Sequence, residues 1–421
     1  MEQEPEARPT NEPAQPVTEA QPSAEEKKRG FRNILLIGLT SMFMDASTEM
    51  VYPLIPLYLV TAFGATPALV GVIEGIAESL ASLMKVFSGY LGDRYKRKKA
   101  LAIGGYSTAL IYKIALILST SWVGVLTARV IDRFGKGVRV APRDALVSEN
   151  AAKTKQGTAF GLHKALDMLG SAFGVLASYF ILRAGAGTAD YQRVFLFSMI
   201  PAVFGLIILS FVREQKQTRV KKTESHPKVS WKSLDIRLRL FLITAFVFNL
   251  GNSSNTFLLL RSYDVGYDAV SVILLYLLYN VVSSALCLPM GKLSDRIGKK
   301  RLLVFGYLAF SLTYLGFAVA KSGIAFLLLF VLYGVYTAMT AGVERALIAV
   351  LAPSEHKGAV LGLHGTLTGI ALLPASVIAG LLWNNVSASA PFFLGAALSF
   401  VAVVAIALIF RRGGESSAQI V

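Results

Sequence analysis

The chain has 421 residues, of which 54% are hydrophobic and only 16% are charged, and its formal net charge is +16. Soluble domains carry about 25% charged residues, so this composition excludes a soluble globule, a disordered chain and a fibre. The apolar residues are concentrated in runs of about 20 residues, the length that a membrane-spanning helix needs. The composition therefore predicts an all-α polytopic membrane protein.

Residues 1–30 are predicted to form a disordered cytoplasmic tail. The first 26 residues hold seven acids, one arginine and five prolines, and they lack the apolar core of a cleavable signal peptide. The rest of the chain is strongly basic. In a membrane protein such an excess usually marks cytoplasmic loops, whereas a nucleic-acid binder would carry it on a soluble basic domain. No nucleic-acid partner is therefore expected.

Twelve apolar runs follow the tail, and we expect each to form a transmembrane helix. The runs are 33–62, 67–91, 100–119, 122–141, 157–182, 194–212, 238–260, 269–290, 302–320, 323–346, 358–384 and 391–410. A basic stretch divides them into two sets of six. The expected domains are an N-terminal six-helix bundle over 31–212, a cytoplasmic linker over 213–237, a C-terminal six-helix bundle over 238–412 and a cytoplasmic tail over 413–421.

The basic residues indicate the orientation of these helices. Lys and Arg gather before the first run, around residues 94–99, in the linker, at 292–301 and at the end of the last run. The alternate connections 63–66 and 385–390 contain neither residue. Because basic loops stay in the cytoplasm, we expect both termini to be cytoplasmic in a multi-pass protein of the cytoplasmic (inner) membrane.

The two halves of the chain repeat each other. The pattern Gly-x-Leu-x-Asp-Arg at 89–94 recurs at 291–296, and Gly-Leu-His at 161–163 recurs at 362–364. An Ala-Leu pair follows Asp144 and, 201 residues later, Arg345. Three matches at nearly one offset indicate a duplicated six-span unit. Many transporters use such halves for alternating access, rocking one bundle against the other about a midplane site.

The two Gly-x-Leu-x-Asp-Arg loops, each followed by a basic cluster, resemble the signature loop of the major facilitator superfamily. The resemblance covers about residues 30–412 and implies a secondary transporter in which Asp93 and Asp295 lock the cytoplasmic face in one state. Arg94 and Arg296 belong to the same gate. The residues support this role, since a carboxylate at a helix end beside cations can form an ion pair in one state and release it in the other.

Two shorter motifs resemble particular branches of that family. Leu126-x-x-Arg129 is similar to the buried-arginine motif of proton-coupled members, although Arg133 stands where a glycine is expected. The fifth run resembles the glycine motif of drug/proton antiporters. Its matching residues are Gly161, Gly170 and Gly174, with Val175 in place of the expected proline, and close helix packing alone is an alternative explanation.

Ionisable residues lie inside several predicted spans, where each costs several kcal/mol unless it is paired or hydrated. Four pairs have i, i+4 spacing and so share a helix face: Asp45/Glu49, Glu74/Glu78, Arg129/Arg133 and His163/Asp167. Helix rise places Glu49, Glu74 and Arg129 at similar depths, roughly 10 Å below the outer surface. We expect these faces to line a shared hydrated interior.

Proton coupling is the function expected of Asp45, Glu49 and Arg129, because carboxylates near a cation can lose and regain a proton as the cavity opens to each side. His163 and Asp167 form a second candidate relay, with helix packing as the alternative for the histidine. Structural salt bridges are an alternative for the whole set. They are the preferred interpretation for Glu74 and Glu78 with Lys85, and for Asp132.

The C-terminal half offers neutral polar residues at the same depth. The candidates for the substrate cavity are Asn249, Asn252, Asn255, Tyr276 and Asn280, together with Arg133 of the first half. Amides and hydroxyls can recognise a substrate without setting its charge, and hydrogen bonding between helices is the alternative. A competing interpretation is that Arg129, Arg133 and Lys136 attract an anionic substrate.

A second set of gate residues is expected at the cytoplasmic ends of the fourth and tenth spans. Arg143 and Asp144 are predicted to oppose Glu344 and Arg345, as an inter-bundle latch would require. No catalytic triad, metal-ligand spacing, ATPase cassette or cofactor motif is apparent, and Cys287 is the single cysteine. An enzyme is therefore not expected.

These patterns together predict a secondary active transporter that exports a small organic solute by proton-coupled alternating access. The expected partners are the solute, protons and the lipid bilayer, and the expected state is a monomer. Uptake of an anionic metabolite is one alternative. A lipid flippase or a non-transporting receptor on the same scaffold is another.

Overall fold

The structure is a computed structural model that describes residues 24–95, 98–151, 156–183, 187–213, 231, 234–321, 323–352 and 357–411. These residues form helices and connections and contain no strand. The helices of the first half are α1 (Ala24–Glu49), η1 (Tyr52–Leu54), α2 (Ile55–Phe63), α3 (Pro67–Tyr95), α4 (Lys98–Ile117), α5 (Trp122–Asn150), α6 (Gln156–Leu182), α7 (Thr188–Phe197) and α8 (Met199–Ser210). Those of the second half are α9 (Ile236–Gly251), α10 (Thr256–Asp264), α11 (Ala269–Ile297), α12 (Lys299–Val319), α13 (Gly323–Thr340), α14 (Val343–Leu351), α15 (Lys357–Asn385) and α16 (Ala390–Arg411).

Ten helical stretches of the described chain are long and apolar enough to cross a membrane. Two of the twelve predicted spans, 122–141 and 238–260, fall outside this set. The helix α5 is long enough but carries charged residues along its length. The other span is interrupted, because α9 ends at Gly251 and α10 begins only at Thr256.

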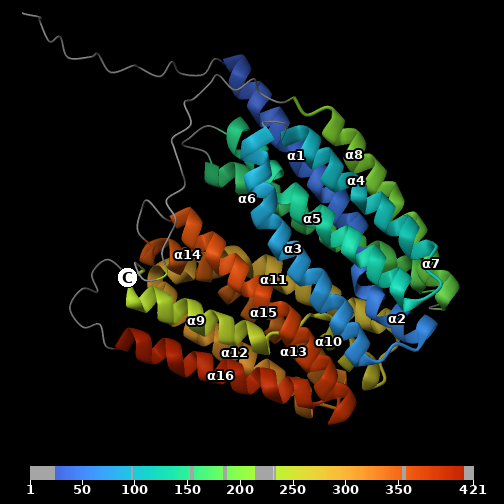
Figure 1. The fold of residues 1–421 in the computed structure, drawn as a ribbon, viewed down its shortest axis with the longest axis vertical. Coiled ribbons are helices and arrows are strands. Elements are labelled where there is room, and N and C mark those ends of the chain that lie inside the picture. Colours follow the sequence, from blue (N-terminus) through green and yellow to red (C-terminus); the bar gives the residue numbers. More distant parts are fainter. Residues whose placement is uncertain are drawn as a thin grey trace, which may run out of the picture.

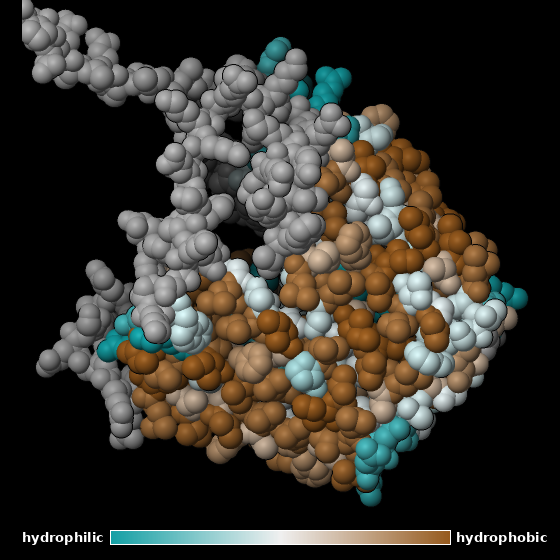
Figure 2. Space-filling view, in the orientation of Figure 1, coloured by the Kyte–Doolittle hydropathy of each residue, from teal (hydrophilic) through white to brown (hydrophobic). Residues whose placement is uncertain are grey.

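The helices form two bundles that lie side by side (Figure 1), one made of α1–α8 and the other of α9–α16. In the first bundle α1 packs against α6 and α8, and α5 packs against α3 and α4. In the second bundle α11 packs against α13, and α12 packs against α13 and α16. Figure 2 shows that hydrophobic residues cover most of the visible face of both bundles, as a lipid-facing surface requires.

The two bundles contact each other mainly through α3 with α15 and through α6 with α11. We call the end where α1 begins and α16 ends the termini side, and the opposite end the far side. At the far side α10 also packs against α2 and α3, and α11 packs against η1. Towards the termini side the bundles diverge (Figure 1), so the conformer is closed at the far side.

Glycines permit the closest approaches between these helices. A Cβ atom on Gly71 of α3 would overlap the main-chain oxygen of Ser376 on α15, and one on Gly75 would lie 3.0 Å from the main-chain oxygen of Leu373. In the first bundle, Cβ atoms on Gly170 and Gly174 of α6 would overlap main-chain oxygens of α1. Gly170 and Gly174 of the fifth-span motif therefore serve helix packing. The surroundings of Gly161, the third glycine of the motif, lie outside the described residues.

Candidate functional site

The buried charges of the first bundle form two layers of ion pairs between α3 and α5. Arg129 donates two hydrogen bonds to Glu74, from Nε to Oε1 at 2.9 Å and from Nη2 to Oε2 at 2.5 Å. One turn further along both helices, Nη2 of Arg133 lies 2.6 Å from Oε1 of Glu78. Asp132 lies between the two arginines, with Oδ2 at 3.6 Å and 3.8 Å from their Nη1 atoms. The i, i+4 spacing of both helices produces this ladder.

The ladder differs from the predicted partnership of Arg129 with Asp45 and Glu49. Arg129 and Glu74 are each 1% exposed, and their two-pronged contact uses both carboxylate oxygens. Glu74 therefore forms a salt bridge, as the structural interpretation above expects, but its partner is Arg129 and not Lys85. The side chain of Lys85 lies outside the described residues.

Glu49 instead joins the two bundles. The hydroxyl of Tyr276 on α11 donates a hydrogen bond of 3.1 Å to Oε2 of Glu49 on α1. The ring of Tyr276 lies 5.9 Å from that of Tyr52 on η1, and Tyr52 in turn lies beneath both arginines of the ladder, 5.5 Å from Arg129 and 5.6 Å from Arg133. Tyr52 therefore links the ladder to the contact between the bundles.

Asp45 and Glu49 differ from the other buried acids in their surroundings. Glu74, Glu78, Asp132 and Asp167, which lie inside the first bundle, each take part in an ion pair. Neither Asp45 nor Glu49 has a Lys, Arg or His nitrogen within 4 Å in that part of the chain. Both side chains are partly exposed.

His163 and Asp167 lie together, as their spacing predicts. The Nδ1 atom of His163 is 3.7 Å from Oδ2 of Asp167, and its Nε2 atom is 2.9 Å from the hydroxyl of Ser41 on α1. Ser41 continues the chain to the hydroxyl of Tyr106 on α4 at 3.1 Å. This set of hydrogen bonds connects α1, α4 and α6 and can both hold a proton and fix the packing of the three helices.

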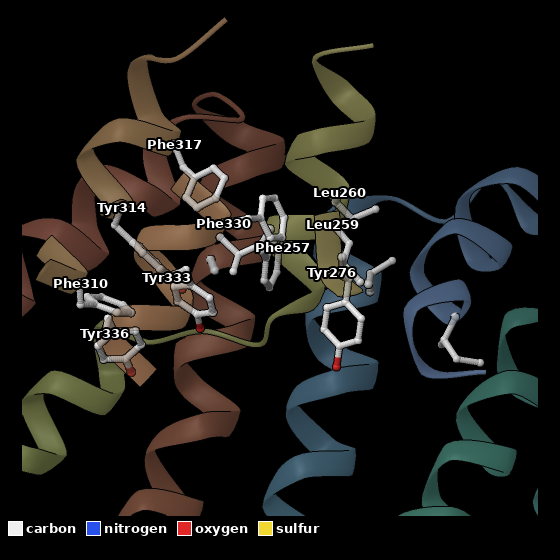
Figure 3. Close-up of a cluster of buried hydrophobic side chains, with 14 of the residues drawn as sticks. Phe257, Leu259, Leu260, Tyr276, Phe310, Tyr314, Phe317, Phe330, Tyr333 and Tyr336 are labelled. Carbon is white, nitrogen blue, oxygen red and sulfur yellow. The ribbon is translucent and has the colours of Figure 1, made fainter. Parts of the chain in front are cut away.

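The second bundle places tyrosines beside the predicted asparagines. Nδ2 of Asn252 donates to the hydroxyl of Tyr336 at 3.1 Å, and the hydroxyl of Tyr333 donates to Oδ1 of Asn255 at 2.7 Å. Figure 3 shows the hydroxyls of Tyr276, Tyr333 and Tyr336 on the same edge of an aromatic cluster. An aromatic wall with hydroxyls and amides along one edge suits a solute that is partly apolar and partly hydrogen-bonding.

The other two predicted amides bond within their own helices. Nδ2 of Asn249 donates to the main-chain oxygen of Ala245 at 2.7 Å, and Nδ2 of Asn280 donates to that of Tyr276 at 3.0 Å. These bonds satisfy one donor of each side chain without contacting another helix. They match neither the substrate-binding nor the interhelical interpretation, so a role for these two residues in the cavity stays a prediction.

Among the gate residues whose side chains are described, no ion pair joins the two bundles in this conformer. Asp295 at the end of α11 pairs with Lys299 at the start of α12, within the same bundle, at 3.0 Å, and Arg143 pairs with its neighbour Asp144 at 2.9 Å. Glu344 accepts a hydrogen bond of 2.8 Å from Tyr307 and lies 3.6 Å from His364. Two gate cations, Arg296 and Arg345, are exposed. The side chains of Asp93 and Arg94 lie outside the described residues. The gate residues therefore do not hold the bundles together here, in agreement with the divergence of the bundles on the termini side.

Two features were missed by the sequence analysis. Lys113 on α4 is fully buried, with Nζ 3.3 Å from the main-chain oxygen of Ala109 and 5.4 Å from the ring centre of Tyr112. It is the one charged residue in the run 100–119, which is a usable signal. The other feature is the contact of Glu344 with His364 and Tyr307.

Among the described residues, no group of three or more His, Cys, Asp or Glu could hold a metal ion.

Comparisons with known proteins agree with the fold and the resemblance. The family model of the Major Facilitator Superfamily matches residues 37–320 and 240–420. An uncharacterised MFS-type transporter of Methanocaldococcus jannaschii is 34% identical over 388 residues, covering 90% of this chain and 96% of the relative. The multidrug resistance protein MdtG of Enterobacter lignolyticus is 25% identical over 287 residues, covering 65% of this chain and 67% of MdtG.

Solved structures show the same fold at low sequence identity. A D-xylose–proton symporter has a TM-score of 0.73 at 16% identity, covering 89% of this chain and 97% of the symporter. A bacterial homologue of the human lysosomal transporter Spinster, in an inward-facing and unoccupied conformation, has a TM-score of 0.66 at 11% identity and covers 92% and 96% of the two chains. The chain belongs to the Major Facilitator Superfamily and is a multi-pass secondary transporter of the alternating-access type, not an enzyme.

Proposed function

We propose that this transporter exports a small organic solute in exchange for protons, with its termini side facing the cytoplasm. The observation that carries the proposal is the Glu49–Tyr276 hydrogen bond, which places a membrane-embedded carboxylate at the contact between the two halves. The basic residues on the termini side support the orientation. The similarity to a multidrug resistance protein supports export of a drug-like or metabolite-like solute.

The distribution of cations supports Glu49 and Asp45 as the proton carriers. A carboxylate inside a membrane is costly unless it is paired, hydrated or protonated. Glu74 and Glu78 are offset by arginines, whereas Glu49 and Asp45 have no such partner among the described residues. Hydration and protonation remain to offset the charge of these two acids, and an acid that is not fixed in an ion pair is free to gain and lose a proton. Because hydrogen bonds to charged acceptors are the stronger ones, the proton on Glu49 also changes the contact with Tyr276.

Uptake of an anionic metabolite is less well supported by this geometry. That alternative rests on Arg129, Arg133 and Lys136 as free cations in the cavity, but Arg129 and Arg133 are already paired with Glu74 and Glu78, which leaves Lys136 alone of the three. The aromatic edge lined by Asn252, Asn255 and Tyr336 carries no charge. Hydrogen-bonding solutes without a strong negative charge suit such a surface best.

We expect Asp45→Asn and Glu49→Gln each to uncouple transport from the proton gradient. A solute is first found by a thermal-shift screen at two pH values, since a ligand that binds only the folded state raises its stability. Everted vesicles with an acidic interior then report proton efflux through a pH-sensitive acridine dye when that solute is added. Wild type should dissipate the gradient and the two variants should not. Glu25→Gln, which removes an exposed acid from the same helix, is the control. Full proton-driven transport by both variants would contradict the proposal.

We expect Tyr276→Phe to loosen the far side. A hydrogen bond to a charged group contributes about 1.5–3 kcal/mol, so its loss should raise the far-side-open population by about tenfold or more. In a Cys287→Ser background, the rate of thiol labelling at Ala68→Cys, next to Asn384 of α15, measures that opening. The same Tyr276→Phe change should have no added effect when Glu49→Met, which removes the acceptor oxygens, is already present. An equal increase in both backgrounds would show that the bond does not hold the bundles together.

A further inference from the structure

A basic cavity of about 810 Å³ lies at the termini-side end of the first bundle, where α1 and α4 begin and α8 ends. Its lining residues are Arg29, Arg32, Leu36, Lys99, Ser210, Phe211, Val212 and Arg213. Half of these residues are cationic and none is acidic. Four positive charges around one hollow repel one another, so the cavity favours an anionic ligand.

Buried hydrogen bonds hold the walls of this cavity in place. Asn33 of α1 is fully buried, and its Nδ2 atom donates to the main-chain oxygen of Arg213 at 2.8 Å and to Oδ1 of Asn150 at 2.8 Å. Its Oδ1 atom accepts from the main-chain nitrogen of Arg213 at 3.3 Å. From the start of α4, Nζ of Lys99 donates to the main-chain oxygen of Ser210 at 2.7 Å. The arrangement is therefore preformed, with the side chains of Arg29 and Arg32 left exposed.

The cavity lies at the level where a bilayer changes from hydrocarbon to headgroup. The apolar spans of α1, α4 and α8 all end here. Phe31 and Phe211 beside the cations are 60% and 63% exposed, as expected of side chains that contact lipid. Figure 2 shows hydrophilic residues at the tip of the first bundle, next to its hydrophobic face. A ligand in this position meets positive charge at one end and apolar surface at the other.

We propose that this cavity binds the headgroup of an anionic phospholipid. Arginine forms two-pronged hydrogen bonds with phosphate, and basic pockets between the ends of transmembrane helices bind anionic headgroups. Arg29, Arg32 and Arg213 contact the phosphate, while acyl chains extend along Leu36 and Phe211. A free soluble anion would use the cations but not the apolar residues. A phospholipid therefore explains why the cavity is lined by cationic residues and by apolar residues.

Native mass spectrometry of the full chain tests this site with phosphatidylglycerol as the ligand and phosphatidylcholine as the neutral comparison. Wild type should retain phosphatidylglycerol selectively. The combined variant Arg29→Gln, Arg32→Gln, Arg213→Gln should bind it about a hundredfold more weakly, since each basic residue near an anionic lipid surface contributes about fivefold. The matched control Lys292→Gln, Lys300→Gln, Arg301→Gln removes the same charge from the termini side of the second bundle and should bind as wild type does.

Several results would overturn the proposal. If phosphatidylglycerol binding falls equally in the combined variant and in its control, the lipid is attracted to any basic surface of the protein. If phosphatidylcholine binds as well as phosphatidylglycerol, the charge of the lipid plays no role. Displacement of the lipid by inorganic phosphate at similar concentrations would identify the ligand as a free anion. The acidic residues of segment 1–23 are the other possible occupant. If the full chain does not bind phosphatidylglycerol and a chain without residues 1–23 does, the segment and not the lipid occupies the cavity.

Discussion

Arg129→Met is expected to lower the free energy of unfolding by about 3–5 kcal/mol, because it leaves the buried carboxylate of Glu74 without its partner. The remaining neighbours cannot replace it: Asp132 is itself acidic, and Arg133 is already engaged with Glu78. Unfolding monitored in mixed micelles measures the loss. Transport by this variant should also fall to background, since the ladder holds Tyr52 against the contact between the bundles.

A double variant separates the ion pair from its individual charges. Arg129→Met with Glu74→Met removes both partners and should recover most of the lost stability, because replacing a buried pair by apolar residues is often neutral or stabilising. Arg193→Met is the matched surface control. It breaks a pair with Asp190 in which the arginine side chain is 67% exposed, and it should cost at most about 1 kcal/mol. An Arg129→Met protein as stable as wild type would show that the pair is not structurally required.

Gly71→Ala is expected to shift the protein away from the conformer that is closed at the far side. The added Cβ atom would overlap the main-chain oxygen of Ser376, which cannot rotate away. Overpacking of this kind costs about 1–3 kcal/mol, which corresponds to a population shift of about five- to a hundredfold. The relief comes from separating α3 and α15 at the far side, as the opposite state of an alternating-access transporter requires.

Pulsed electron paramagnetic resonance can measure that shift. Spin labels at Thr66→Cys and Ser387→Cys, two exposed far-side positions on different bundles, should show a longer distance in Gly71→Ala than in wild type. Gly104→Ala is the control, because a Cβ atom at Gly104 would have no neighbour within 4 Å. An unchanged distance distribution in Gly71→Ala would mean that the helices adjust locally, without separating the bundles.

The sequence predicted the membrane passes well because apolar length is a direct consequence of bilayer thickness. It included the two irregular passes, 122–141 and 238–260, among the spans but did not predict the features that make them irregular. In α5 the charges are tolerated because they pair with acids of α3, which composition alone does not reveal. In the seventh span, the sequence Gly-Asn-Ser-Ser-Asn at 251–255 is a loop-like cluster that indicates a break. It was read instead as a set of substrate-binding side chains.

The helix faces that carry the buried charges could be predicted from the sequence, but the ion pairs between them could not. Spacing of i, i+4 correctly placed Glu74/Glu78 and Arg129/Arg133 on single helix faces, and the two faces meet. Depth along the membrane also grouped Glu49 with them. The rotation of each helix about its own axis decides these contacts. It brings Arg129 to Glu74, and Glu49 to Tyr276. That rotation depends on tertiary packing and has no signature in one helix alone.

The interruption of the seventh pass has a mechanical consequence. The half-helix α9 packs against α15 and α16 of its own bundle, whereas α10 packs against α11 of its own bundle and also against α2 and α3 of the neighbouring one. The residues between them, 252–255, lack the continuous hydrogen bonds that stiffen a helix. The break therefore lets one membrane pass serve two packing partners, with α9 inside its own bundle and α10 at the contact that closes the far side.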